Sequence, residues 1–156
     1  MLMGDDVEVQ TQDWDDKIKE QYDKFEDKIL MVVPSDGRVK GNKTHGDEVT
    51  LWPDKSLPSG HFALHKNWIK ALGYFGPPFF WHFYLDTYTQ KVARKVNRCL
   101  FLPTVTFKAK KIFDSTHDQV KDHLSISARD QWIWSKVNGR HLQADVKQLS
   151  DFIKSY

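Results

Sequence analysis

Carboxylates that could do chemistry stand at two places in the chain. Asp5 and Asp6 follow the apolar residues 1–3 and Gly4, and the alternating residues 7–10 come next, so the acidic pair lies between two strand-like fragments. Adjacent carboxylates are poorly suited to burial unless a cation balances them. Their hard oxygen atoms suit Mg²⁺ or Mn²⁺ bridging to a diphosphate. Glycine and aspartate are also ordinary turn residues, so an exposed hairpin turn is the alternative interpretation.

The second place is Asp86, which opens a predicted helix. The apolar residues of this helix recur at helical spacing, as Leu85, Tyr88, Val92 and Val96. In the first turn, the helix dipole and the unpaired backbone amides favour a charged carboxylate, which can accept a proton from a bound hydroxyl group. The alternative is that Asp86 serves only to cap the helix, as aspartate commonly does.

Histidine and aromatic residues are dense in the stretch that leads to Asp86. His61 and His65 flank three apolar residues, and Trp81 and His82 lie in an aromatic run that follows a Gly-Pro-Pro turn. Aromatic rings can cover the apolar face of a sugar as well as they cover each other. Each of these four residues is about as often packed in a core as it is functional.

The remaining pattern alternates segments typical of strands with segments typical of helices, which indicates an α/β fold. A polar excursion over residues 34–60 interrupts it. The predicted elements are a helix over 14–25 capped by Asp13, a buried strand over 29–33, an edge strand over 48–52, a strand over 61–65 running into a helix that stops at Gly73, the helix from Asp86, strands over 99–102 and 104–107 separated by Pro103, and helices after residue 114 that break at Asn138 and Gly139.

Length and composition limit the classes of protein to consider. The 156 residues, 40% of them hydrophobic, can bury one core, so we expect a single domain over residues 1–156. The formal charge is +2 and the basic residues are scattered, which does not indicate a nucleic-acid surface. The single cysteine, Cys99, excludes an intrachain disulfide. Without a signal-like or membrane-spanning apolar run, we expect a cytoplasmic protein with no membrane span.

In order and residue type, these pieces resemble the inverting, metal-dependent GT-A glycosyltransferases. The resemblance covers roughly residues 1–108 and has two independent parts, the apolar-Gly-Asp-Asp-Val start and the stretch from Gly60 to Arg94. In the second part, the matching pieces are Gly60, residues 72–75, residues 79–84, Asp86 and Arg94, and Leu85 stands where the family usually has the glutamate of a Glu-Asp pair.

The resemblance implies a partial GT-A fold, a mixed sheet flanked by helices, and transfer of a hexose from a nucleotide-diphosphate donor to a hydroxyl acceptor with inversion. It implies that Asp86 is the general base, that Asp6 binds Mn²⁺ or Mg²⁺, and that Asp5 lies beside the metal or the donor ribose. Lys108 or Lys110 stands near the place where family members often carry a histidine ligand. A lysine could pair with the diphosphate there instead, although an ordinary basic strand end is as good an interpretation. His61, His65, Trp81 and His82 would shape the acceptor pocket, which needs Asp6 and Asp86 to approach one cleft.

The chain begins almost at the acidic motif, where complete GT-A enzymes have a nucleotide-binding half before it. We therefore expect that half to be encoded upstream, lost, or supplied in trans. If it is lost, the alternative is a non-catalytic remnant that binds carbohydrate or protein through its aromatic surface, and a hydrolase using Asp6 and Asp86 is a third interpretation. Residues 109–156 would form a helical extension, and its apolar stripe packs on the core or supports a homodimer.

Overall fold

A mixed β-sheet lies at the centre of the computed structural model, which describes residues 7–35, 50–51, 61–81, 83–109 and 123–156. Its described strands run in the order β1-β5-β2-β4, and β3 also pairs with β5. β2 and β5 are parallel, whereas the other pairs are antiparallel. The expectation of an α/β fold with a mixed sheet flanked by helices is therefore confirmed. The strands are β1 (Val7–Val9), β2 (Met31–Ser35), β3 (Thr50–Leu51), β4 (Ala63–Leu64) and β5 (Cys99–Ala109).

The long strand β5 joins most of the sheet and differs from the prediction of two strands separated by Pro103. β5 continues through Pro103 without interruption. The proline is accommodated because the register with β2 shifts there: Leu102 faces Pro34, and the next paired residue, Ser35, faces Thr106. Where the pairing is irregular, the strand does not need the backbone N–H donor that proline lacks.

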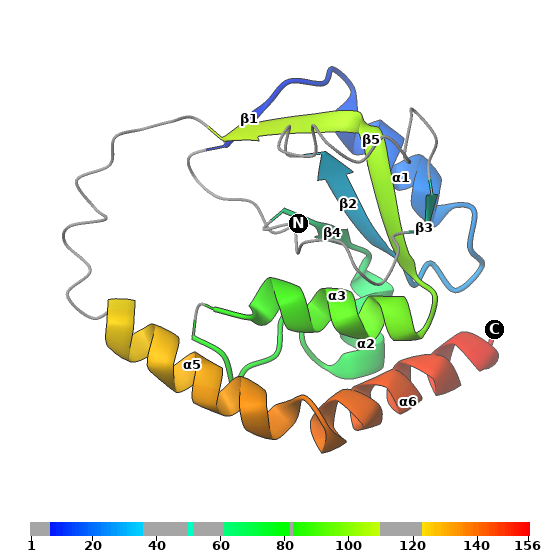
Figure 1. The fold of residues 1–156 in the computed structure, drawn as a ribbon. Helices are drawn as coiled ribbons and strands as arrows, with labels where there is room; N and C mark the ends of the chain where they lie inside the picture. The colour runs from blue at the N-terminus through cyan, green and yellow to red at the C-terminus, as the bar shows by residue number, and fades with distance from the viewer. Residues whose placement is uncertain (1–6, 36–49, 52–60, 82, 110–122) are drawn as a thin grey trace.

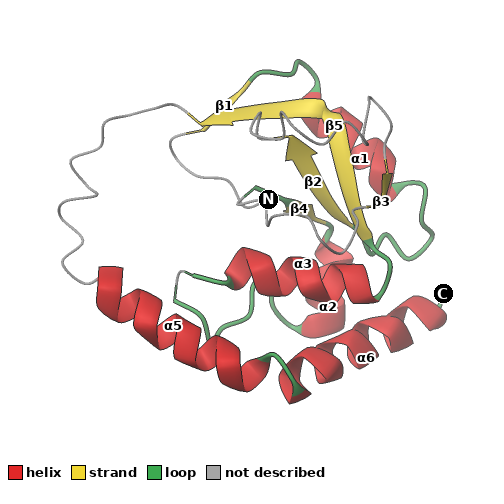
Figure 2. Ribbon diagram, in the orientation of Figure 1, coloured by secondary structure: helices red, strands yellow, loops and turns green. Residues whose placement is uncertain are grey.

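Helices cover both sides of the sheet (Figures 1 and 2). α1 lies against one side, and α2 and α3 lie against the other, with α5 and α6 forming an outer layer below them. This arrangement follows from β2, whose successive residues point in opposite directions and are buried from Met31 to Pro34. Among the described residues, none of the helices is both long and apolar enough to cross a membrane. The helices are α1 (Trp14–Tyr22), α2 (Lys66–Leu72), α3 (Leu85–Lys95), α5 (His123–Val137) and α6 (Arg140–Lys154).

Two hydrophobic clusters result, one on each side of the sheet. Met31 and Val33 of β2 belong to the larger cluster, beneath α2, α3 and α6, whereas Val32 belongs to the smaller cluster, beneath α1. The larger cluster also holds Phe62, Trp68, Phe80, Tyr88, Val92, Cys99, Leu142 and Leu149, and the smaller one holds Ile18, Tyr22, Leu30, Ala63, Leu100, Leu102, Val105 and Phe107.

The ends of the helices agree with the sequence signals at some places and not at others. Gly73 ends α2 in the left-handed conformation, with φ of 83°, as expected for a terminal glycine. Asp13 stands at the start of α1, but its side chain makes no capping hydrogen bond and its φ is 55°. Asp13 therefore occupies the predicted N-cap position, but the prediction that its side chain caps the helix is wrong. A residue in the left-handed region does not have the extended backbone that a capping side chain normally needs.

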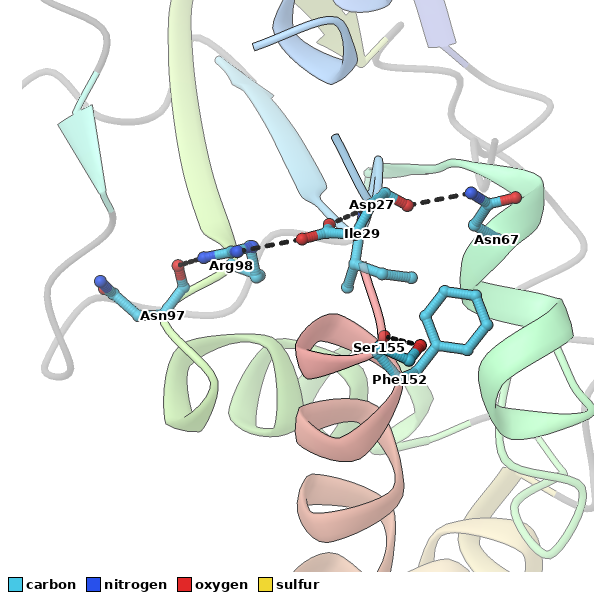
Figure 3. Close-up of polar contacts among 7 residues, drawn as sticks. All are labelled: Asp27, Ile29, Asn67, Asn97, Arg98, Phe152 and Ser155. Carbon is cyan, nitrogen blue, oxygen red and sulfur yellow. Dashed lines mark hydrogen bonds and ion pairs between the residues drawn. The ribbon is translucent and has the colours of Figure 1, made fainter. Parts of the chain in front are cut away.

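A buried polar junction fixes where β2 begins (Figure 3). Asp27 is 5% exposed, and its Oδ1 accepts a 2.6 Å hydrogen bond from the backbone N–H of Ile29. Its Oδ2 pairs with Arg98 Nη2 at 3.2 Å, and its carbonyl oxygen accepts from Asn67 Nδ2 at 2.9 Å. The backbone N–H of Ile29 thus donates to a side chain and not to a neighbouring strand. This explains why β2 begins at Met31 and not at residue 29 as predicted.

The last helix, α6, is held by both apolar and polar contacts. Leu149 is fully buried, and Val146, Phe152 and Ile153 pack against the same cluster, so this stripe covers the core of its own chain. Homodimer formation through it stays a prediction. One carboxylate oxygen of Asp145 also accepts hydrogen bonds from the hydroxyl groups of Tyr74 and Tyr88, the latter at 2.6 Å. Burial, reinforced by this carboxylate, raises the pKa of both tyrosines.

Candidate functional site

Asp86 lies in the first turn of α3, where the sequence places it. Its side chain is partly buried, and Oδ1 accepts hydrogen bonds from the backbone N–H of Thr87 at 2.7 Å and from Thr87 Oγ1 at 3.3 Å. Within the described residues, Oδ2 accepts no hydrogen bond and the carboxylate has no ion-pair partner. One oxygen therefore complements the amino end of the helix, and the other is available to accept a proton.

Three residues of the aromatic run before Asp86, Phe79, Phe80 and Tyr84, pack in or against the larger cluster. Phe80 is 5% exposed and packs with Tyr88, their ring centroids 5.9 Å apart, and Tyr84 stacks on Trp134 of α5 at 5.3 Å with an interplanar angle of 18°. Trp81 is the exception, because it is 66% exposed. The run thus anchors the start of α3 while presenting one tryptophan to solvent.

A residue that the sequence analysis did not single out holds this run in place. Asp130 of α5 has no exposed surface, and its carboxylate accepts hydrogen bonds from the backbone N–H groups of Trp81 and Phe83. Arg129, its neighbour in α5, pairs with the same carboxylate at 2.8 Å and lies over the Trp81 ring. The signal in the sequence was weak, an aspartate inside a stretch rich in apolar and aromatic residues. Its partners lie almost fifty residues earlier, so no local pattern links them.

His61 and His65 of the predicted acceptor set have structural contacts of their own. His65 stands before α2, where its Nδ1 accepts a 3.2 Å hydrogen bond from the backbone N–H of Asn67, and its ring lies 5.3 Å from that of Tyr22. Burial and three nearby lysine charges lower the pKa of His65. The ring of His61 lies 6.3 Å from that of Phe107.

These ring partners separate the two histidines from the tryptophan in the predicted acceptor set. Tyr22 and Phe107 belong to the cluster beneath α1, whereas Trp81 contacts α5 on the opposite side of the sheet. The structure therefore places Trp81 on the same side as α3, which carries Asp86, and gives His61 and His65 contacts elsewhere. A common acceptor-binding role for these residues stays a prediction.

The predicted metal and donor residues are only partly described. Asp5, Asp6, His82 and Lys110 lie outside the described residues, so the approach of Asp6 to Asp86 stays a prediction. Lys108 is exposed on β5 and faces Glu8 of β1 in the antiparallel register. A search of the described part of the chain finds no group of three histidine, cysteine, aspartate or glutamate side chains that could hold a metal ion.

The chain was compared with protein-family models, with curated proteins and with solved structures, and none of the three comparisons found a match.

Proposed function

We propose that the chain is a glycosyltransferase of the inverting GT-A type, which transfers a sugar from a nucleotide-diphosphate donor to a hydroxyl acceptor. The observation that carries this proposal is the environment of Asp86. Its carboxylate is partly buried in the first turn of α3, with one oxygen bonded to Thr87 and no ion partner among the described residues. The α/β architecture with a mixed sheet is compatible with the same family.

In the proposed reaction, Asp86 takes the proton of the acceptor hydroxyl as that oxygen attacks the anomeric carbon of the donor. The new carbon–oxygen bond forms on the face opposite the bond to the diphosphate, which breaks, so the anomeric configuration inverts. The proton remains on Asp86 and the nucleoside diphosphate leaves. Asp6, with Asp5 beside it, would hold Mn²⁺ or Mg²⁺, which supplies positive charge next to the diphosphate. Lys108 and Lys110 are the candidate partners for the diphosphate within this chain.

A second candidate function is carbohydrate or protein binding without catalysis. The observation that favours it is the exposure of two tryptophans, Trp81 at 66% and Trp132 at 64%, since large aromatic side chains at the surface are common in binding sites. Under this alternative, Asp86 would only stabilise the start of α3.

Substitution of Asp86 by asparagine tests the choice between the two. The protein is supplied with Mn²⁺, a panel of nucleotide-diphosphate sugars and hydroxyl acceptors while release of nucleoside diphosphate is followed. Asp86→Asn keeps the shape of the side chain, so we expect turnover to fall by on the order of a hundredfold with donor binding nearly unchanged. The loss of stability should be only about 0.5–1 kcal/mol.

Asp16→Asn is the matched control, because Asp16 also lies in the first turn of a helix, α1, and pairs with Lys19 at the surface. It should change stability by a similar amount and leave turnover as it is. Equal turnover for wild type and Asp86→Asn would remove Asp86 from the reaction. No transfer with any donor would favour the binding function.

A further inference from the structure

The backbone around Trp81 is held by a buried carboxylate from a helix far along the chain. Asp130 Oδ2 accepts from the N–H of Phe83 at 2.9 Å and from that of Trp81 at 3.2 Å, and Oδ1 lies 3.3 Å from the Trp81 nitrogen. Hydrogen bonds from backbone amides to a fully buried carboxylate are stronger than bonds between neutral groups. The segment that leads into α3 and Asp86 is therefore fixed from α5.

The indole ring of Trp81 is held separately, by the neighbouring arginine. The guanidinium carbon of Arg129 lies 3.8 Å from the centroid of the Trp81 ring, while Nη1 of the same group pairs with Asp130 Oδ1 at 2.8 Å. One face of the indole is therefore covered by a planar group whose own position is fixed by an ion pair. Since Trp81 is nevertheless 66% exposed, its open surface must be the opposite face and the ring edges.

The charges of this unit decide which ligand suits the open face. Among the described residues, the positive charge of Arg129 is balanced by the carboxylate of Asp130, which also accepts from two backbone amides, so Arg129 and Asp130 together carry no net charge that would favour an anion. What the unit presents is a rigid aromatic surface. The apolar face of a neutral pyranose ring fits such a surface, and a platform that is already ordered loses little entropy on binding.

We propose that Arg129 and Asp130 are positioning residues that hold Trp81 as a stacking platform for a neutral saccharide. The inference rests on the proposed function, because it makes Trp81 the acceptor-binding residue, and it extends the site to α5. The helical part of the chain after residue 109 then contributes to saccharide binding and does not serve only as an extension of the fold.

Fluorine NMR of protein labelled with 5-fluorotryptophan tests the platform directly. The six tryptophans give separate signals, and the Trp81 signal is assigned with Trp81→Phe. The protein is titrated, without donor or cation, with cellotetraose, maltotetraose, chitotetraose and a sulfated heparin tetrasaccharide. We expect the Trp81 signal to shift and saturate with at least one neutral tetrasaccharide, and Arg129→Gln to weaken that binding by on the order of fivefold or more.

Trp132 and Lys136 provide the matched controls on the same helix. Trp132 is 64% exposed, but Lys136 lies 5.9 Å from its ring centroid and does not hold it in the same way. The Trp132 signal should stay in place, and Lys136→Gln should bind as the wild type does. Unchanged signals from the other five tryptophans in Arg129→Gln will establish that this variant is folded.

The inference is overturned if no neutral tetrasaccharide moves the Trp81 signal, if only the sulfated one does, or if Arg129→Gln binds as tightly as the wild type. These outcomes are separable from those for glycosyl transfer. Saccharide binding at Trp81 without consumption of any donor would leave the inference standing and remove the transfer reaction. Sugar transfer with an acceptor KM that is unchanged in both Trp81→Ala and Arg129→Gln would support the transfer reaction and overturn the role of Trp81 as a platform.

Discussion

Replacement of Asp27 by alanine should destabilise the protein far more than loss of a surface aspartate. The substitution removes the acceptor for the N–H of Ile29, a residue with no exposed surface, and the partner of Arg98. An unsatisfied buried amide costs about 1–3 kcal/mol, and breaking a buried ion pair costs about 3–5 kcal/mol in all. The Arg98 side chain is 20% exposed and lies over the Phe25 ring, so water and the ring still partly stabilise its charge when Asp27 is removed. We therefore expect the free energy of unfolding to fall by about 3 kcal/mol, near the lower end of the range for breaking a buried ion pair.

Urea denaturation followed by far-ultraviolet circular dichroism measures this loss. With a slope of about 2 kcal/mol/M, the midpoint should fall by about 1.5 M. Asp27→Asn keeps an acceptor for the N–H of Ile29 but loses the negative charge, so its urea midpoint should lie between those of the wild type and Asp27→Ala. Asp23→Ala is the control: Asp23 pairs with Lys28 at 2.8 Å, but both side chains are exposed. An exposed pair of this kind is worth about 0–1 kcal/mol.

The reasoning would be refuted by equal midpoints for Asp27→Ala and Asp23→Ala. That result would mean that the Asp27 junction adds nothing beyond what a solvent-exposed ion pair adds. A midpoint for Asp27→Asn as low as that of Asp27→Ala would mean that the charge matters and that the hydrogen bond to Ile29 does not.

Two further predictions concern the segment before Asp86 and the single cysteine. A Cβ atom at Gly76 would lie 2.8 Å from Leu85 Cδ1, so Gly76→Ala must displace the side chain of the residue before Asp86 and should lower stability by about 1 kcal/mol. Thermal melting compares Gly76→Ala with the wild type, and an unchanged melting temperature would contradict the argument. Burial raises the pKa of the Cys99 thiol to about 11, so the thiol should resist iodoacetamide at neutral pH until the protein is unfolded. Because an unfolded thiol ionises near pH 8.5, stability should fall as pH rises from there toward about 11, and Cys99→Ala should make that part of the pH profile flatter.

The parts of the fold that local signals specify were predictable from the sequence. Gly73 ends α2 and the Asn138–Gly139 pair separates α5 from α6, because glycine favours backbone conformations that interrupt a helix. The stripe of α6 lies on the core, as helical periodicity indicates. The start of α3 was placed within one residue for the same reason.

The parts that depend on distant residues were not predictable. Pro103 fails to end a strand because a register shift in β2 accommodates it, and nothing near Pro103 in the sequence records that shift. The anchoring role of Asp130 depends on amides that lie in another segment. Local patterns could therefore locate Asp86, but only the tertiary structure identifies the residues that hold the chain around it.

The central position of β5 also has a consequence for how the chain folds. β1, β2 and β3 each pair with β5, but all three are made from earlier parts of the chain, and Val7 pairs with Ala109. Each pairing must close a long loop before it gains any hydrogen bond, which makes sheets with such non-local contacts slow to assemble. Until β5 joins them, the early strands expose unpaired edges, and the chain passes through a period in which association with other unfolded chains competes with folding.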